Sequence, residues 1–185
     1  MRIIGGEARG RRLFSPDGDE TRPTSDKVRE ALFSIIARRV PDADVLDLFG
    51  GTGALALEAM SRGAQRAVIC DVSGKAGECI KRNIEAVMKG CEGVSFLKAD
   101  YRKALESLKG RTFDIVFLDP PYRLSDAYAD CARRLADGRL LKEDALIVAE
   151  RAVQTQVNWP DGFTLRDKRV YRDTALDFVS MEDMP

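Results

Sequence analysis

The chain has 185 residues, of which 44% are hydrophobic and 32% are charged, a length and composition typical of one globular domain. Its 30 basic and 30 acidic residues balance, which counts against a strong non-specific nucleic-acid binder. The absence of histidine excludes histidine-based triads, histidine-ligated zinc and general-base catalysis by histidine.

Nothing in the sequence indicates a membrane or secreted protein. No apolar run reaches the roughly 18 residues that a membrane-spanning helix needs, and residues 1–6 lack the apolar core of a signal peptide. The four cysteines are scattered without a Cys-x-x-Cys pair, which indicates free thiols in a reducing compartment. We therefore expect a cytoplasmic protein that binds neither a membrane nor a metal ion, and we expect it to be a monomer.

Residues 1–23 are rich in Gly and Arg, which predicts a short extended or hairpin extension ahead of the main domain. Its arginines near the start are Arg2, Arg9, Arg11 and Arg12, with Glu7 as their acidic neighbour. Such a run could contact phosphates, although an ordinary solvated surface is the preferred interpretation of the run taken alone.

Residues 24–185 form the predicted main domain, in which helices and strands alternate. Thr24 or Ser25 could cap a helix whose apolar face continues to Ile36. Apolar strands are expected at 45–49, 67–71, 94–97, 113–118 and 145–149, with helices ending near Glu58 and spanning about 77–89, 102–108 and 125–136. Two further strands, at 164–171 and 175–179, have no helix between them, which predicts an antiparallel hairpin at a sheet edge.

Apolar strands separated by helices are typical of a parallel sheet with helices on both faces. The expected fold is therefore α/β and Rossmann-like, a mostly parallel sheet closed by the C-terminal hairpin. Ligands bind such sheets beyond the carboxyl ends of the strands. Two unusual loops, 50–53 and 119–122, follow strand ends, so we expect them to face one crevice.

The loop Asp47-Leu48-Phe49-Gly50-Gly51-Thr52-Gly53 indicates a nucleoside-type cofactor, because its glycines allow a sharp turn and a close approach of the backbone to a ligand. Gly51, Gly53 and Ala56 also fit the dinucleotide fingerprint, and a glycine-rich turn without a ligand is the plain alternative. Asp47 favours S-adenosylmethionine, since a carboxylate would repel a diphosphate but suits an amino group and a sulfonium. The expected cofactor contacts are Asp47, Phe49, Gly50, Gly51, Thr52 and Gly53, with Asp71 and Val72 after the second strand.

The motif Asp119-Pro120-Pro121-Tyr122 indicates chemistry on the amino group of a nucleobase. Its prolines make the loop stiff and remove two N–H donors. The Asp119 carboxylate and the Pro120 carbonyl could hold both amine protons, while Tyr122 could stack on the base. These four residues, Asp119, Pro120, Pro121 and Tyr122, are the candidate catalytic residues, although a purely structural turn is the alternative.

The whole chain resembles the RsmD family of bacterial 16S ribosomal RNA guanine-N2 methyltransferases, within the class I fold. The resemblance covers the opening residues 1–11, the segment from Thr21-Arg22-Pro23-Thr24 to Phe33, the loop from Asp47, and residues 113–122. Glu150 and Asp173-Thr174-Ala175-Leu176 fit the closing part of the family pattern. Arg172 departs from it, because the family usually has glycine there.

The resemblance implies a seven-stranded sheet, S-adenosylmethionine as cofactor, and methylation of guanine 966, in standard 16S numbering, on the small ribosomal subunit. It implies that the extension, with Arg2, Arg9, Arg11 and Arg12, contacts RNA, and that Arg22, Pro23 and Thr24 lie near the methionine end of the cofactor. Asp100 and Tyr101 would lie near its adenine.

Three other functions remain open at this point. The Asp-Pro-Pro-Tyr motif alone does not separate guanine-N2 from adenine-N6 or cytosine-N4 targets, so a DNA adenine-N6 methyltransferase is the main alternative. The chain is short for a separate DNA-recognition domain, which weakens that alternative. A nucleotide-dependent oxidoreductase lacks a recognisable hydride-transfer site, and a non-catalytic RNA-binding protein would not need Asp47, Gly51, Gly53 and Asp119 together.

Overall fold

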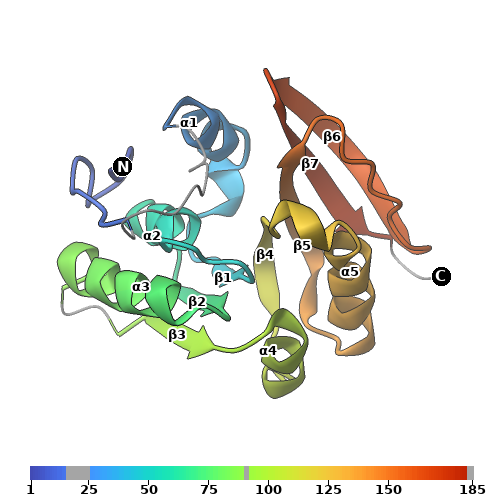
Figure 1. Cartoon of the computed structure of the whole chain (residues 1–185), viewed down its shortest axis with the longest axis horizontal. Helices are drawn as coiled ribbons and strands as arrows, with labels where there is room; N and C mark the ends of the chain where they lie inside the picture. Colours follow the sequence, from blue (N-terminus) through green and yellow to red (C-terminus); the bar gives the residue numbers. More distant parts are fainter. Residues whose placement is uncertain (16–25, 90–91, 183–185) are drawn as a thin grey trace.

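The computed structural model describes residues 1–15, 26–89 and 92–182, and for Tyr122 it describes the backbone alone. This part of the chain folds into one sheet with helices packed on it (Figure 1). The elements in chain order are α1 (Asp26–Ile35), η1 (Ala37–Arg39), β1 (Asp44–Asp47), α2 (Ala54–Ser61), β2 (Arg66–Asp71), α3 (Gly74–Val87), β3 (Val94–Lys98), α4 (Tyr101–Ser107), β4 (Phe113–Leu118), η2 (Tyr122–Leu124), α5 (Ala127–Asp137), β5 (Leu141–Ala152), β6 (Phe163–Tyr171) and β7 (Thr174–Met181).

The sheet has seven strands in the order β3-β2-β1-β4-β5-β7-β6. Strands β1 to β5 run parallel to their neighbours, whereas β7 is antiparallel to both β5 and β6. The predicted Rossmann-like α/β fold with a C-terminal antiparallel hairpin is therefore confirmed. Within that hairpin β7 lies inside the sheet and β6 forms its edge.

Helices cover both faces of the sheet, as the continuously apolar strands require. Alternate strand residues such as Ile115 and Phe117 pack against α1, α2 and α3. The residues between them, such as Val116 and Leu118, pack against α4 and α5 on the other face. In Figure 1, α4 and α5 lie on the opposite side of the sheet from α2 and α3.

The strand order reverses between β1 and β4, which pair in parallel with Asp47 opposite Phe117. In open α/β sheets this reversal opens a crevice beyond the carboxyl ends of the strands, where ligands bind. The cofactor loop follows β1 and the Asp-Pro-Pro-Tyr motif follows β4, so both predicted loops flank this point.

Most helix and strand ends predicted from the sequence lie within a few residues of those in the structure, with two kinds of exception. Strand β5 begins at Leu141, four residues before the apolar run, because its first residues extend along β4, with a register shift between Phe113 and Ile115. The two short helices η1 and η2 were not predicted, and two prolines directly precede η2. No helix in the described part of the chain is long and apolar enough to cross a membrane.

Candidate active site

The loop after β1 makes a tight turn into α2. The backbone N–H of Gly50 donates to the Cys70 carbonyl at 2.8 Å, and that of Gly53 donates to the Gly50 carbonyl at 2.6 Å. Gly51 and Gly53 have φ angles of 57° and 79°, in the left-handed region that other residues rarely adopt. The two glycines are therefore needed for the turn itself, which brings the backbone to the crevice.

Asp71, the last residue of β2, holds this loop in place. Its Oδ2 accepts from the N–H of Gly51 at 2.9 Å, and its Oδ1 accepts from the N–H of Ser73 at 2.8 Å. Val72, the next residue, is 67% exposed, which is unusual for a large apolar side chain. Asp71 and Val72 thus lie beside the glycine loop at the crevice, where the sequence predicts that a nucleoside-type cofactor binds.

Asp47 is a buried carboxyl group at the carboxyl end of β1. It is 2% exposed and accepts from the backbone N–H groups of Phe49 and Ala56. Burial raises the pKa of Asp47 to about 7, and the nearby Asp71 carboxylate adds to the rise. A positively charged ligand at this point would favour the ionised form of Asp47 and would itself be bound more tightly.

Asp119 follows β4 directly and begins the predicted reaction motif. It lies beyond the last residue of β4 that pairs with β5. Asp119 is exposed at the carboxyl end of the strand, and the next residue, Pro120, is buried. The surrounding protein removes water from the Asp119 carboxyl group, and this desolvation raises its pKa well above the usual range. Repulsion from Glu150 and Asp47 raises the pKa further. Pro121 precedes η2, and the side chain of Tyr122 lies outside the described atoms.

Glu150 brings a further carboxyl group to the same edge. In the parallel pairing of β4 with β5, Leu118 lies opposite Ala149, so Asp119 and Glu150 are the next neighbours. Phe117 and Val148 pack on the α1 side of the sheet, and by alternation Asp119 and Glu150 point to that side too. The Glu150 carbonyl accepts from the Tyr128 hydroxyl at 2.7 Å, which fixes this strand end.

Aromatic side chains close the site on the α4 side. The ring of Phe49 lies 5.5 Å from that of Tyr101, centroid to centroid, at 45°. Tyr101 is only 4% exposed, and its hydroxyl donates to Asp130 at 2.8 Å, so it points away from the crevice and supports Phe49 from behind. Asp100 caps α4 through the N–H of Arg102 and remains half-buried.

The N-terminal extension forms a small hairpin that is anchored on α2. Arg2 and Arg12 form an antiparallel bridge. The buried carboxylate of Glu58 accepts from the N–H groups of Ile4 and Gly5, each at 2.8 Å. The Ser61 hydroxyl accepts from the N–H of Ala8 at 2.9 Å. Residues 1–13 are therefore held against the domain by backbone contacts, as expected for a fixed extension.

Asn83 joins the extension to the cofactor loop. It is fully buried on α3, and its Nδ2 donates to the Thr52 carbonyl at 2.8 Å and to the Phe14 carbonyl at 3.0 Å. Its Oδ1 accepts from the N–H of Phe14 at 2.7 Å. The position of Thr52 is thus linked to that of the extension through one side chain.

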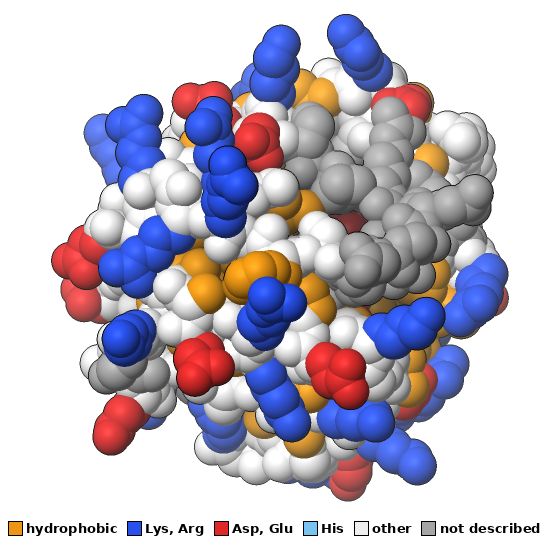
Figure 2. Space-filling model, turned by 60° about the vertical axis from the view of Figure 1, so that its left-hand side comes forward, with side chains coloured by type: hydrophobic (Ala, Val, Ile, Leu, Met, Phe, Trp, Pro, Cys, Tyr) orange, Lys and Arg blue, Asp and Glu red, His pale blue; other side chains and the backbone are white. Residues whose placement is uncertain are grey.

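The extension arginines do not all have the same surroundings. Arg9 and Arg12 are exposed, whereas Arg11 donates to the Val87 carbonyl at 2.6 Å and Arg2 approaches Asp26 at 3.8 Å. Figure 2, which brings the side with the extension forward, shows many Lys and Arg side chains spread around a few apolar ones. The predicted cofactor contacts Arg22, Pro23 and Thr24 lie outside the described residues.

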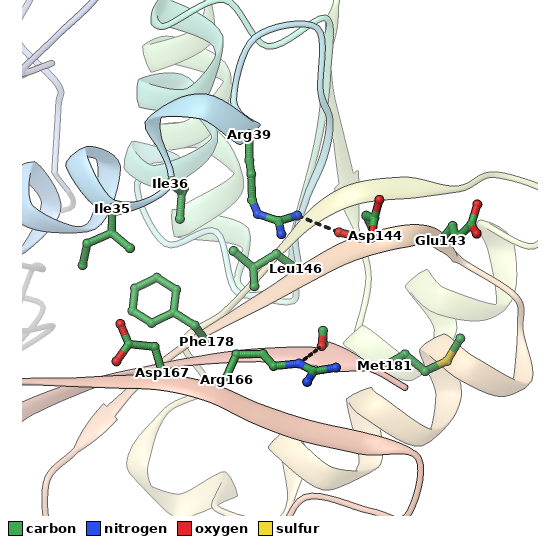
Figure 3. Close-up of a pocket in the computed structure, with 11 residues that line it drawn as sticks. Ile35, Ile36, Arg39, Glu143, Asp144, Leu146, Arg166, Asp167, Phe178 and Met181 are labelled. Carbon is green, nitrogen blue, oxygen red and sulfur yellow. Dashed lines mark hydrogen bonds between the residues drawn. The ribbon is translucent and has the colours of Figure 1, made fainter. Parts of the chain in front are cut away.

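A separate hollow of about 360 Å³ lies between α1 and the C-terminal strands (Figure 3). Ile35, Leu146 and Phe178 form its apolar part, with Arg39 and Arg166 beside them. It is lined by the first residues of β5, far along the strand from Glu150. No predicted site residue lines it.

The carboxyl groups of the crevice fit S-adenosylmethionine better than a dinucleotide. Asp47 and Asp71 end β1 and β2, Asp119 follows β4, and Glu150 lies two residues before the end of β5. A ligand with an ammonium and a sulfonium would reduce the repulsion among these groups, whereas a pyrophosphate would increase it. This charge pattern decides between the two cofactors that the glycine loop left open.

Sequence reasoning missed Glu150 as a site residue, although its signal was the one used for Asp47, Asp71 and Asp119: an acid that ends an apolar strand. It also missed Asn83, Glu58 and Asp130, whose contacts join segments far apart in the chain. No local pattern distinguishes these residues from ordinary surface positions of a helix.

Comparison with known proteins shows which family the chain belongs to. The family model described as "Conserved hypothetical protein 95" matches residues 1–180. The chain is 38% identical over 183 residues to the ribosomal RNA small subunit methyltransferase D of Escherichia coli strain K12, covering 98% of this chain and 90% of that protein. It is 30% identical to the protein of that name from Haemophilus influenzae, covering 89% and 86%.

A solved structure from Thermus thermophilus, of a protein described as hypothetical, superimposes with a TM-score of 0.82 at 29% identity and covers 99% of both chains. The match therefore extends from the N-terminal extension to the C-terminal hairpin and includes every strand end of the crevice. The chain belongs to the RsmD family of S-adenosylmethionine-dependent methyltransferases.

Proposed function

We propose that this protein transfers a methyl group from S-adenosylmethionine to the exocyclic N2 amine of a guanine in 16S rRNA of the small ribosomal subunit, at guanine 966 by family resemblance. The observation that carries the proposal is the 38% identity over 98% of the chain to an enzyme named for the small-subunit rRNA. The carboxyl groups around the crevice support the same reaction.

Asp119 and Pro120 would hold the target amine. The amine has two N–H donors, for which the Asp119 carboxylate and the Pro120 carbonyl are the acceptors. S-adenosylmethionine, when bound, supplies a methyl carbon that its positive sulfur has already activated. The cofactor would leave as the neutral thioether after giving up this carbon, and Asp119 would accept a proton from the amine nitrogen. Much of the catalysis then comes from positioning.

The raised pKa of Asp119 suits this role only when a positive charge is present. A protonated carboxyl group keeps one acceptor oxygen but cannot take up the proton that the amine loses. A cationic ligand beside Asp47 would lower the pKa of Asp119 and favour its ionised form. Asp119 would therefore be a better base when the cofactor site is filled.

Glu150 supports guanine as the target base. Guanine presents two adjacent donors on its pairing edge, the N1–H and the N2 amine, whereas adenine and cytosine present a ring-nitrogen acceptor beside their amine. An enzyme that flips out a base reads this edge by hydrogen bonds. Two neighbouring carboxyl groups, Asp119 and Glu150, match two neighbouring donors and would repel a ring-nitrogen lone pair.

The anchored hairpin of residues 1–13 supports an RNA-contacting role for the extension, 1–23, ahead of the methyltransferase domain, 24–185. The four arginines of the hairpin, Arg2, Arg9, Arg11 and Arg12, are all exposed, and Arg2 and Arg11 also contact Asp26 and Val87. The double substitution Arg9→Ala/Arg12→Ala is expected to weaken RNA binding and to lower the slope of log affinity against log salt by about one to two. An unchanged slope would assign both arginines to ordinary surface.

The reaction is tested with S-adenosylmethionine that carries a labelled methyl group. The protein is incubated with small subunits lacking the modification, the RNA is digested to nucleosides, and DNA is treated in parallel. Label in N2-methylguanosine is the expected result. Label in N6-methyladenine from DNA would replace the proposal with the alternative, and label in another rRNA base would contradict the role given to Glu150.

A further inference from the structure

An arginine-lined hollow of about 340 Å³ lies beside the reaction loop, on the sheet face opposite the N-terminal extension. It is lined by residues of the first turn of α4, of η2 and of α5, and α4 and α5 are neighbours in Figure 1. Its cationic lining consists of Arg102, Arg123, Arg133 and Arg134.

Asp130 organises part of this hollow. Its Oδ2 accepts from the Tyr101 hydroxyl at 2.8 Å, from Arg134 Nε at 3.0 Å and from Arg102 Nε at 3.3 Å. Burial alone would raise the pKa of Asp130, but the hydrogen bonds from Tyr101 and Arg134 outweigh it and lower the pKa below its usual value. One permanent negative charge therefore holds two guanidinium groups in fixed positions.

The hollow keeps a surplus of positive charge. Four arginines face Asp126 and Asp130, and Asp100 approaches Arg102 at 3.9 Å from beside the lining, so positive charge still exceeds negative charge by one. Arg123 and Arg133 are exposed. Like charges gathered in one hollow repel one another unless an anion joins them, and the guanidinium fork matches the oxygens of a phosphate.

The position of the hollow relates it to the reaction. Arg123 immediately follows Tyr122, the last residue of the reaction motif, and lies in the same short helix. Tyr101 lies between the hollow and Phe49, next to the cofactor loop. A strand of RNA whose base enters the crevice at Asp119 must pass its backbone over one of the two rims.

We propose that this hollow is a binding site for backbone phosphates of the RNA next to the target nucleotide. The inference rests on the proposed function, and it gives the RNA a second contact across the crevice from Arg9 and Arg12. The hollow takes a phosphodiester and reads no base, since its charged groups suit phosphate oxygens.

The test uses the full chain with the double substitution Arg123→Ala/Arg133→Ala and a fluorescent single-stranded RNA of mixed sequence. Binding is measured by anisotropy at several salt concentrations. We expect affinity to fall about tenfold near 0.1 M salt, and the salt slope to fall by about 1.4, since each phosphate contact to a single strand contributes about 0.7. The control is Arg38→Ala/Lys109→Ala, which removes two positive charges beyond the amino ends of the strands and is expected to leave both values unchanged.

A second measurement separates the RNA from the cofactor as occupant. Calorimetric affinity for S-adenosylhomocysteine is expected to stay within twofold in the Arg123/Arg133 variant. A tenfold loss there, or a salt slope equal to that of the unaltered protein, would overturn the inference. Failure of the unaltered protein to bind the RNA would overturn it as well. The salt slope of the variant could fall as expected while the unaltered protein fails to methylate small subunits. That result would count against the proposed function alone, because the RNA probe is bound through phosphates and needs no particular base.

Discussion

Strand β1 carries a buried aspartate at each end, and the surroundings of the two are opposite. Asp44 begins the strand and is 6% exposed, while Asp47 ends it and is 2% exposed. Asp44 accepts from Arg66 Nε at 2.7 Å and from Lys142 Nζ at 3.0 Å. Burial alone would raise the pKa of Asp44, but these two cations outweigh it and lower the pKa. Asp47 accepts from backbone N–H groups, and its pKa rises to about 7.

The difference separates a carboxylate that holds the fold from one that receives a ligand. At the amino edge of the sheet the compensating cations come from the protein, as Lys142 also reaches Asp114 at 2.7 Å. At the carboxyl edge Glu150 and Asp47 repel the Asp119 carboxylate, and Asp71 repels that of Asp47. The described residues bring no cation to the buried Asp47 carboxyl group, whose ionisation is therefore costly. This cost indicates that a positive ligand completes the site at Asp47.

The largest expected effect comes from Asp119→Ala, which removes the acceptor at the target amine. We expect kcat to fall by about 1,000-fold, because a positioned acceptor contributes about that much to a reaction of this kind. Affinity for S-adenosylhomocysteine should stay within a few-fold. The control is Asp137→Ala, an exposed acid at the end of α5. Wild-type turnover in the Asp119 variant would show that another group holds the amine.

Exchanging the carboxyl for an amide at each end of β1 tests the comparison itself. Asp47→Asn is expected to weaken S-adenosylmethionine binding by about 10- to 100-fold, since a charge-assisted contact is lost. It should also stabilise the ligand-free protein at pH 8 by on the order of 2 kcal/mol, because the costly ionised group is gone. Asp44→Asn should leave cofactor affinity unchanged and destabilise the fold by about 1–2 kcal/mol. Calorimetry and urea unfolding measure both, and equal behaviour of the two variants would contradict the comparison.

The sign of the pH dependence follows from the raised pKa of Asp47. The folded protein holds this proton up to about pH 7, whereas the unfolded chain releases it near 3.8. Stability from Asp47 is therefore complete at low pH and declines as the pH rises between those values. The stabilisation by Asp47→Asn should accordingly vanish at about pH 4, where Asp47 is protonated in the folded protein.

A smaller effect is expected from Glu150→Gln. The amide keeps one acceptor oxygen but loses the negative charge that strengthens the hydrogen bond from guanine N1–H, so kcat/KM should fall by about tenfold. Loss of the Glu150 charge also lowers the pKa of Asp119, so the acidic limb of the pH–rate profile should move to lower pH. A lower rate with an unmoved profile would mean that Glu150 acts on the fold and not on the site.

The sequence predicts most of this site because the end of a continuous apolar run marks the end of a buried strand. Asp71 and Asp119 each follow such a run, Asp47 lies just ahead of the glycine loop, and parallel strands bring their carboxyl ends together. The charge state of these groups could not be predicted, since it depends on which cationic side chains from other segments lie near each end of the strand. The roles of Asn83 and Asp130 could not be predicted for the same reason, because their hydrogen-bond partners lie in distant segments of the chain.

Arg172 shows how a departure from the family pattern can be explained once the backbone is known. It lies in the two-residue turn between β6 and β7, with a φ angle of 56°, in the region that favours glycine. The family's usual glycine fits that turn without strain. Arg172 keeps the turn and adds an exposed charge, far in sequence from the carboxyl groups of the site.

The most direct test follows the carboxyl carbons of Asp44 and Asp47 by NMR as the pH is changed, with and without S-adenosylmethionine. The account predicts that Asp47 titrates near 7 in the free protein and at least one unit lower with the ligand, while Asp44 titrates below its usual range in both states. An Asp47 that titrates near 4 without the ligand, or does not respond to it, would contradict the claim that this edge of the sheet is completed by a cation.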